Sequence, residues 1–471
     1  SDLVLGGIRH GDVAGDSPLM RATGTEFFAS RHERLQDPGL PIPATEAFAG
    51  HLSVKAEHAR DTGGFDESFT GYGCEDWDFG QRLIDRGARV AYLPEAMVAH
   101  RSRITRQRWL RDARDEAASQ LLLIDKHPAL ASETDLGGLF SSSLLGRMAA
   151  HLAMHLPGFG RVAGAAFFEL AEAAEYIRLR TTARHLLAHS FRAVYWSAVA
   201  REVGSAREAR RRFEFHARVL CYHRVTDTPN PALAEWAVTP RQLEEHMQFL
   251  ARKRYTAVTC SELIRRFKTG EATARLVAIT FDDGYEDTVT AAAPILVRAG
   301  FVATVFAVTD RIGKTAEWDA AFGGEMAPLA TAEQLNSLAA VGWEIGHHTA
   351  THPDLTSVAD AQLSVEMGES WHALQRSISA PVTTFAYPYA AYDARVMQAA
   401  LACGYAGAFG IGTRWASPQS RPGAIERVFV LSRHSLPDFR MLLWIGLDRR
   451  DLVRHVVGMP LRLLRRPSVT G

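Results

Sequence analysis

Short apolar runs alternate with longer helical stretches along the second half of the chain. The runs are four to six residues long and rich in β-branched and aromatic residues, a pattern typical of buried strands. Strands that alternate with helices in this way indicate parallel β/α units. The strand runs are residues 276–281, 302–307, 342–345, 383–386, 405–409 and 428–431, and the helical stretches include residues 287–299 and 393–403.

Two adjacent aspartates follow the apolar run that ends at Phe281. Asp282 and Asp283 are therefore expected at the carboxyl end of a parallel strand, where the catalytic residues of β/α barrels gather. Neighbouring carboxylates repel each other and resist burial unless a cation or a proton compensates their charge. One interpretation of this strand end is a metal site, and the other is a solvated Asp-Asp-Gly turn.

Two histidines follow the strand run at residues 342–345. His348 and His352 have a spacing that would place both imidazoles on one side of a helical turn, directed at a single ion. The alternative is a surface pair without a ligand. Combined with one aspartate, two histidines leave coordination positions open for water, which is typical of a catalytic rather than a structural metal site.

These motifs resemble those of the polysaccharide deacetylases of the NodB-homology type, carbohydrate esterase family 4. The resemblance extends from about Arg218 to about Leu443, and it also includes residues 221–225 as an opening strand, 239–243 as a helix start and 385–389 as a third motif. It implies an α/β fold, a distorted and incomplete (β/α) barrel of NodB type with a divalent metal, usually zinc, at its mouth. The implied activity is hydrolysis of the acetamide C–N bond of an N-acetylated sugar in a poly- or oligosaccharide, with release of acetate.

The resemblance also implies a role for each residue of the site. Asp282 would act as general base, taking the proton of the attacking water while the metal polarises the acetamide carbonyl. Pro388 and Tyr389 would contact the substrate, and backbone N–H groups near Tyr389 would hold the oxyanion. The metal ligands would be Asp283, His348 and His352.

Two residues of the third motif depart from the family pattern. Ala390 stands where many relatives have glycine, and Ala386 stands where many have an arginine that orients the base. His223 or Arg224, after the presumed first strand, then becomes the candidate for orienting Asp282. His223 is also expected to contact the substrate, and the alternative for it is an ordinary strand-end histidine.

The general acid of the family comes from a late Leu-x-His segment. The nearest equivalent, residues 431–434, has one residue too many, and a slip of one residue in a strand reverses the face to which a side chain points. His434 is therefore the candidate acid. The alternatives are that it begins a turn, and that another group or water protonates the amine.

The first hundred residues resemble the acceptor half of a family 2 glycosyltransferase, through residues 63–67, 71–79 and 92–100. The resemblance implies that Asp76 deprotonates the acceptor hydroxyl and that His100 lies near a nucleotide-bound metal. Without it, Glu75 and Asp76 would be an acidic helix start. No Asp-x-Asp precedes Gly63, so we expect a fragment or a degenerate transferase that transfers no sugar by itself.

The pattern divides the chain into four parts: a partial transferase at 1–104, a helical connector at 105–215, the deacetylase domain at 216–445 and a basic amphipathic tail at 446–471. The connector is rich in Ala, Leu and Arg and contains no uninterrupted apolar stretch long enough to span a bilayer. A connector packed on its neighbours is the first interpretation, and helices lying on a membrane surface are the second. The tail is expected to be either a solvated helix or a contact to anionic lipid.

Composition excludes some classes of function. Lys+Arg and Asp+Glu both number 53, so no net positive field favours nucleic acid. The four cysteines lack Cys-x-x-Cys spacing, which argues against a disulfide scaffold and against thiolate zinc. We therefore expect a cytoplasmic setting. Peripheral contact with the inner face of the membrane is a second interpretation. The partner is expected to be an N-acetylated glycan. Two alternatives are a transferase with an auxiliary deacetylase and a catalytically silent saccharide-binding barrel.

Overall fold

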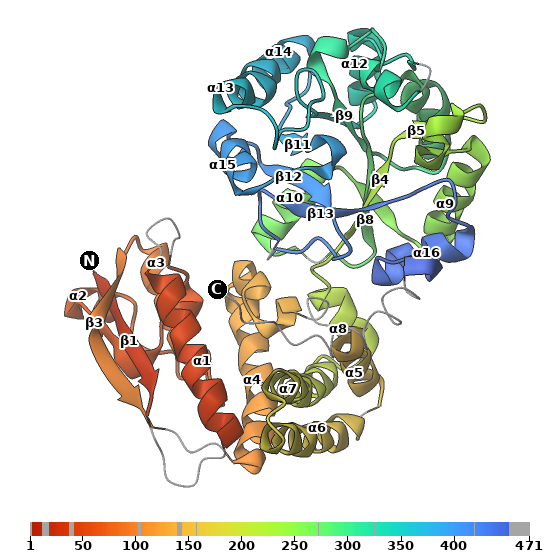
Figure 1. Ribbon diagram of the computed structural model, residues 1–471. Helices are drawn as coiled ribbons and strands as arrows, with labels where there is room; N and C mark the ends of the chain where they lie inside the picture. Colours follow the sequence, from red (N-terminus) through yellow and green to blue (C-terminus); the bar gives the residue numbers. More distant parts are fainter. Residues whose placement is uncertain are drawn as a thin grey trace. The chain divides into compact units, whose positions relative to one another are not determined.

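The computed structural model describes residues 2–11, 18–36, 42–101, 105–138, 144–156, 158–271, 273–323, 326–418 and 420–451. It forms two compact units: unit 1 comprises Ser1–Glu214 with Thr269–Ala272, and unit 2 comprises Phe215–Lys268 with Thr273–Gly471 (Figure 1). The finer four-part division remains a prediction, and most of its basic tail, residues 452–471, lies outside the described residues.

A three-stranded sheet and several helices open unit 1. The sheet has the order β2-β1-β3, with β1 (Leu3–His10) antiparallel to β2 (Leu52–Val54) and parallel to β3 (Val90–His100). Helix α3 (Glu75–Asp85) buries Phe79 and Leu83 against Leu3 and Leu5 of β1. The other two helices are α1 (Pro18–Leu35) and α2 (Ala56–Asp61).

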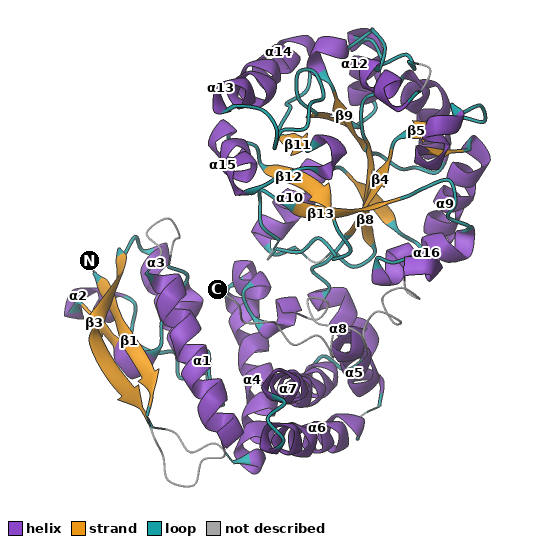
Figure 2. Ribbon diagram, in the orientation of Figure 1, coloured by secondary structure: helices purple, strands orange, loops and turns teal. Residues whose placement is uncertain are grey.

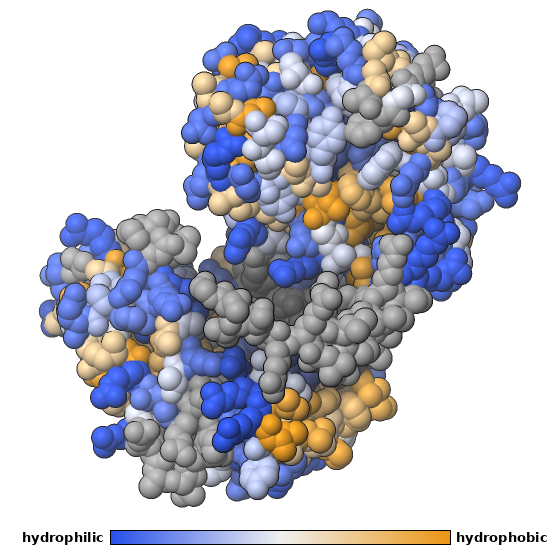
Figure 3. All heavy atoms as spheres, in the orientation of Figure 1, coloured by the Kyte–Doolittle hydropathy of each residue, from blue (hydrophilic) through white to orange (hydrophobic). Residues whose placement is uncertain are grey.

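The predicted connector is helical in the structure. Its helices are α4 (Arg106–Lys126), α5 (Leu144–His155), α6 (Phe159–Tyr176), α7 (Arg180–Glu202) and α8 (Ala206–Phe213). Apolar side chains gather on the surface over α5 and α6 (Figure 3), where Val162, Leu170 and Ile177 are exposed. Among the described residues, every helix is too short or too polar to cross a lipid bilayer.

Unit 2 is a barrel of parallel strands. Seven strands pair in the order β4-β13-β12-β11-β10-β9-β8, and β8 pairs with β4 to close the ring, one strand fewer than a full (β/α)₈ barrel has. An additional strand, β7, pairs with the first half of β8. The strands are β4 Arg218–Tyr222, β7 Thr256–Val258, β8 Leu276–Phe281, β9 Thr304–Ala307, β10 Glu344–His347, β11 Thr384–Ala386, β12 Gly407–Ile411 and β13 Ile425–Phe429.

Helices surround the strands of the barrel, as Figure 2 shows. One apolar core joins the outward side chains of the strands, such as Ile279 and Val305, to helix residues such as Leu243 and Leu335. Burying an aliphatic side chain of this size stabilises the fold by about 1.5–3 kcal/mol. The helices are α9 Pro240–Arg252, α10 Cys260–Thr269, α11 Ala293–Arg298, α12 Ala332–Ala340, α13 Asp360–Leu363, α14 Ser370–Ser377, α15 Ala394–Cys403 and α16 Leu436–Ile445, with π-helical turns η6 Thr288–Ala292 and η9 Ser364–Glu369 and a small sheet of β5 Arg224–Val225 and β6 Ala237–Val238.

The parallel β/α architecture predicted from the apolar runs is confirmed, and some boundaries shift. The run at 276–281 coincides with β8, whereas the runs at 405–409 and 428–431 are displaced from β12 and β13 by two or three residues. Apolar residues continue into the loops there, so hydrophobicity alone does not mark where the ladder ends. The helix expected at 287–299 begins as the π-turn η6 because Pro294, at the start of α11, has no N–H for an ordinary helical bond.

Candidate active site

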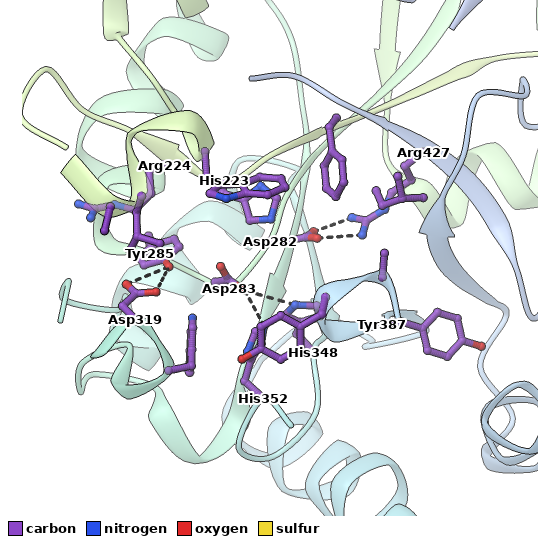
Figure 4. A pocket seen from close by; sticks show the side chains of 18 residues that line it. His223, Arg224, Asp282, Asp283, Tyr285, Asp319, His348, His352, Tyr387 and Arg427 are labelled. Atoms are coloured by element: carbon purple, nitrogen blue, oxygen red, sulfur yellow. Dashed lines mark hydrogen bonds and ion pairs between the residues drawn. The ribbon is translucent and has the colours of Figure 1, made fainter. Parts of the chain in front are cut away.

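A pocket of about 340 Å³ opens at the carboxyl ends of the barrel strands (Figure 4). The residues that follow β4, β8, β10 and β11 supply most of its charged and aromatic groups, as expected for this edge of a parallel barrel. The lining residues are His223, Arg224, Ala232, Leu233, Trp236, Asp282, Asp283, Tyr285, Trp318, Asp319, His348, His352, Tyr387, Tyr389, Ala390, Ile411, Arg427 and Phe429.

Asp283, His348 and His352 converge in this pocket. All three side chains are buried, and their ligand atoms lie within 4.8 Å of one another. Oδ1 of Asp283 is 3.3 Å from Nε2 of His348 and 3.1 Å from Nε2 of His352. Burial raises the pKa of Asp283, but the adjacent imidazoles outweigh it and hold the pKa well below its ordinary value. Burial lowers the pKa of His352 and so favours the neutral imidazole.

The geometry and chemistry of these three residues fit a metal site. Nδ1 of His348 donates to the carbonyl oxygen of Ala386 at 2.7 Å, which leaves the lone pair of Nε2 directed toward Asp283. Two imidazoles and one carboxylate, held together in a buried pocket, are a donor set suited to zinc or a similar divalent ion. The ring of His352 is further held by stacking on Trp318, with ring centroids 4.3 Å apart.

The two histidines do not lie on a helical turn, contrary to the prediction from their spacing. They lie in the loop after β10, where Thr349 and His352 both have φ of +68°. These left-handed residues turn the chain so that both imidazoles face Asp283, which itself has φ of +70°. Left-handed backbone is uncommon for residues with a side chain and concentrates at functional sites.

Asp282 is set apart from the cluster by a buried ion pair. Arg427 on β13 donates to both carboxylate oxygens, from Nη1 to Oδ1 at 2.5 Å and from Nη2 to Oδ2 at 2.8 Å. Sγ of Cys221 donates to Oδ2 at 3.4 Å. Burial raises the pKa of Asp282, but the charges of Arg427 and then His348 lower it by more than burial raises it. The pKa of Asp282 therefore lies below its ordinary value. The carboxylate is thus held ionised and oriented by Arg427.

Arg427 is the residue that sequence reasoning missed, and it corrects the suggestion that Arg224 orients Asp282. Nε of Arg224 binds Oδ2 of Asp287 at 2.7 Å instead, because β5 turns its side chain toward the start of η6. His223 lines the pocket and packs against Trp236 and Phe429, with ring centroids 5.0 and 5.7 Å away. Arg427 lies next to Glu426 and just before the apolar run at 428–431, so little in the sequence indicated that it would be buried.

His434 lies away from this pocket, contrary to the expectation of a general acid there. Its Nδ1 accepts from the backbone N–H of Leu431 at 3.0 Å, and its Nε2 donates to Oδ2 of Asp448 at 3.0 Å. β13 ends at Phe429, and residues 431–434 form a turn in which the N–H of His434 donates to the carbonyl of Leu431. The extra residue therefore produces a turn, one of the alternatives, and not a strand side chain that points into the barrel mouth.

The third motif contributes Tyr389 to the pocket, whereas Pro388 is buried beside it and does not line the cavity. Tyr389 and Ala390 both have φ of +54°. The ring of Tyr389 packs on His352 with centroids 4.6 Å apart. Ala390 thus occupies a left-handed position, which explains the preference for glycine there.

Four further pocket residues were not predicted. Trp236 and Trp318 provide aromatic walls, and Tyr285 donates its hydroxyl to both carboxylate oxygens of Asp319, at 3.1 and 3.2 Å. Burial, followed by the charge of Asp283, raises the pKa of Asp319 to about 6. In the sequence, the only sign of these residues was an adjacent Trp318 and Asp319 between two predicted strands. Apolar walls with a few polar groups are typical of small-ligand pockets.

Asp76 and His100 belong to unit 1 and do not line the barrel pocket. Asp76 lies in the first turn of α3, and its Oδ2 accepts from the N–H of Ala49 at 3.0 Å. Burial raises the pKa of Asp76 to about 6. His100 ends β3 and packs against Phe28, with ring centroids 5.6 Å apart.

Two family models match separate parts of the chain. Residues 269–408 match the polysaccharide deacetylases, and residues 29–106 match the N-terminal domain of galactosyltransferase. A Bacillus subtilis protein named as a polysaccharide deacetylase, YxkH, is 27% identical over 188 residues, which are 40% of this chain and 61% of that protein. The pre-mycofactocin glycosyltransferase of Mycobacterium tuberculosis is 30% identical over 154 residues, 32% of this chain and 30% of that enzyme. The chain thus spans less than two thirds of each relative.

Solved structures are similar to about half of the chain. The Streptococcus pyogenes deacetylase PplD in complex with acetate has 25% identity and a TM-score of 0.43, covering 49% of this chain and 97% of that one. IcaB from Ammonifex degensii has 20% identity and a TM-score of 0.41, covering 49% and 96%. Residues 269–408, which form much of the barrel unit, thus match the polysaccharide deacetylases, and residues 29–106 of unit 1 match a glycosyltransferase-type family.

Proposed function

We propose that unit 2 is a metal-dependent hydrolase that removes acetyl groups from N-acetylated sugars of a poly- or oligosaccharide. The observation that supports this proposal most strongly is that one pocket holds both a set of metal-binding side chains and a separate carboxylate. Asp283 with two imidazoles forms a ligand set, while Asp282, one residue away, is held by Arg427 as a separate ionised carboxylate. A pure binding site would have no use for the second carboxylate.

Asp283, His348 and His352 would hold the metal, and their mixed nitrogen and oxygen donors favour zinc. When bound, such an ion polarises a carbonyl group and increases the acidity of nearby water. The chain itself fixes the orientation of the ligands, through the bond from His348 to Ala386 and the stacking of Trp318 on His352.

Asp282 acts as the general base in this proposal. It takes a proton from the water that attacks the acetamide carbon, while Arg427 keeps its carboxylate ionised before that step. A carboxyl group with a lowered pKa gives its proton up readily, so Asp282 then returns the proton to the nitrogen as the C–N bond breaks. Acetate and a free amine result, and no role remains for His434.

The pocket walls would bind the sugar. Trp236 and Trp318 offer aromatic surfaces: Trp236 packs against His223, and Trp318 stacks on His352. Tyr389 also lines the pocket and packs on His352. Backbone N–H groups near Tyr389 are the proposed donors to the oxyanion.

Acetate release from N-acetylglucosamine oligomers, with and without a chelator, tests this proposal. Asp282→Asn and His348→Ala should each abolish release, whereas His372→Ala, which removes an exposed histidine of α14, should not change it. Activity retained in both site variants would refute the mechanism. Metal binding without turnover on any oligomer would instead favour the silent saccharide-binding barrel.

A second proposal concerns unit 1, which we infer supplies the acceptor side of a glycosyl transfer site with Asp76 as its base. The match of residues 29–106 and the burial of the Asp76 carboxyl support it. We expect no hydrolysis of nucleotide sugars by this chain and unchanged acetate release in Asp76→Asn. Clear turnover of a nucleotide sugar would refute the expectation that the chain transfers no sugar by itself.

A further inference from the structure

We propose that Glu366 is a positioning residue that fixes the turn carrying His348 and His352, and through it the second imidazole of the ligand cluster. The inference rests on the metal site of the proposed function. Glu366 is a buried carboxylate that does not line the pocket.

The contacts of Glu366 are directed almost entirely at this turn. Its Oε2 accepts from the backbone N–H groups of Ala350 and Thr351, each at 3.0 Å. Its Oε1 accepts from the hydroxyl of Thr351 at 2.7 Å and from the side-chain amide of Gln362 at 3.1 Å. Three donors therefore come from the two residues at the centre of the His348–His352 segment.

The burial of Glu366 gives these contacts their weight. The residue is 1% exposed, and among the described residues no Lys, Arg or His forms an ion pair with it. A buried carboxylate without a cation must be compensated by hydrogen bonds, and backbone N–H groups are its remaining source. Glu366 lies in η9, a π-helical turn between α13 and α14, and π-turns are frequent next to functional sites.

The turn needs such support because its backbone is unfavourable. Thr349 and His352 are both left-handed, a conformation that persists only when the surroundings determine it. The carbonyls of Thr349 and Ala350 accept from the N–H groups of Thr309 and Asp310, each at 3.0 Å. The loop after β9 thus holds the carbonyl side of the turn, and Glu366 holds its N–H side.

His352 depends on this support more than His348 does. The ring of His348 is oriented by its own bond to Ala386, whereas Nδ1 of His352 has no hydrogen-bond partner among the described residues. The direction of the His352 ring is therefore set by the backbone of the turn and by packing on Trp318 and Tyr389. Loss of Glu366 should release one ligand of the three and leave the other two in place.

Titration of the metal-free full chain with Co²⁺, followed by visible absorbance, tests the inference. Glu366→Ala should bind Co²⁺ about 10–100-fold more weakly than the wild type, the range seen when groups that support metal ligands are removed. Glu366→Gln, which keeps one acceptor oxygen, should lie between the two. Glu369→Ala, which removes an exposed carboxylate of the same π-turn, should bind as the wild type does. Saturating metal should restore acetate release in Glu366→Ala.

Equal Co²⁺ affinity in the wild type and in Glu366→Ala would overturn the inference while leaving the proposed function intact. Absence of Co²⁺ binding by the wild type would overturn both. Far-UV circular dichroism of the metal-free proteins identifies a folding defect in Glu366→Ala. In that case the milder Glu366→Gln decides: affinity unchanged from the wild type refutes the positioning role, and a weaker affinity supports it.

Discussion

Replacement of Arg427 by methionine should damage both the stability and the chemistry of unit 2. The Arg427 and Asp282 side chains are 1% and 5% exposed, and two hydrogen bonds join them. Methionine fills much of the arginine volume but leaves Asp282 as a buried charge without its cationic partner. Breaking a buried pair in this way costs about 3–5 kcal/mol.

The same change should raise the pKa of Asp282. Burial alone raises this pKa, and the charge of Arg427 is the first cause that lowers it. Without that charge the carboxyl should bind a proton at higher pH, so that the acidic limb of the rate profile moves upward. Loss of a general base at neutral pH reduces kcat by about 10²–10⁴-fold.

Urea unfolding and acetate release measure the two effects. Arg414→Met, which breaks an ion pair whose arginine side chain is 86% exposed, is the matched control and should alter neither quantity appreciably. The double variant Arg427→Met with Asp282→Asn carries no unpaired charge, so it should recover at least about 2 kcal/mol of the lost stability while remaining inactive. If the double variant is no more stable than Arg427→Met, the buried-charge reasoning is refuted.

Three further predictions follow from other features. Ala390→Gly should raise the free energy of unfolding by about 0.5–1 kcal/mol, because glycine tolerates the left-handed φ of +54°; a lower Tm contradicts this. Burial lowers the pKa of His246 to about 3, so between pH 6.5 and 3 the protein takes up a proton when it unfolds and loses stability as the pH falls. His246→Gln should reduce the slope of the unfolding free energy against pH in this range by about 1.4 kcal/mol per pH unit. An unchanged slope contradicts this prediction. If the apolar surface of α6 contacts lipid, the wild type should sediment with anionic vesicles, and the double variant Val162→Glu with Leu170→Glu should not. A wild type that does not bind these vesicles rules the contact out.

The barrel and its ligand cluster could be predicted from the sequence because their signals are local. The run at 276–281 is bounded by Arg275 and Asp282, so composition alone marked both ends of β8. The carboxyl ends of parallel strands share one edge, and this rule favoured a common site for the aspartate pair and the histidine pair. The choice of Asp283 over Asp282 as the ligand came from the family resemblance. A strand followed at once by metal-binding side chains indicated a metal site at that strand end.

The parts that failed depend on contacts between distant residues. Arg427 meets Asp282 across 145 positions, and nothing in either segment states that β13 lies next to β4 and β4 next to β8. The helical spacing of His348 and His352 misled because left-handed residues can bring the same pair together in a loop. The prediction for His434 was wrong about its position because residues 431–434 form a turn after β13 and do not continue the strand.

The strand order of the barrel also sets when its chemistry can begin. The three proposed metal ligands all come from β8 and the loop after β10, whereas the partner of Asp282 comes from β13, which follows every other strand of the barrel in the chain. A polypeptide that has emerged only as far as β12 would already possess the ligand set. It could load its ion, yet its base would lack the arginine that keeps it charged. Under the proposed function, hydrolysis should therefore appear only when β13 has entered the ring and closed the barrel.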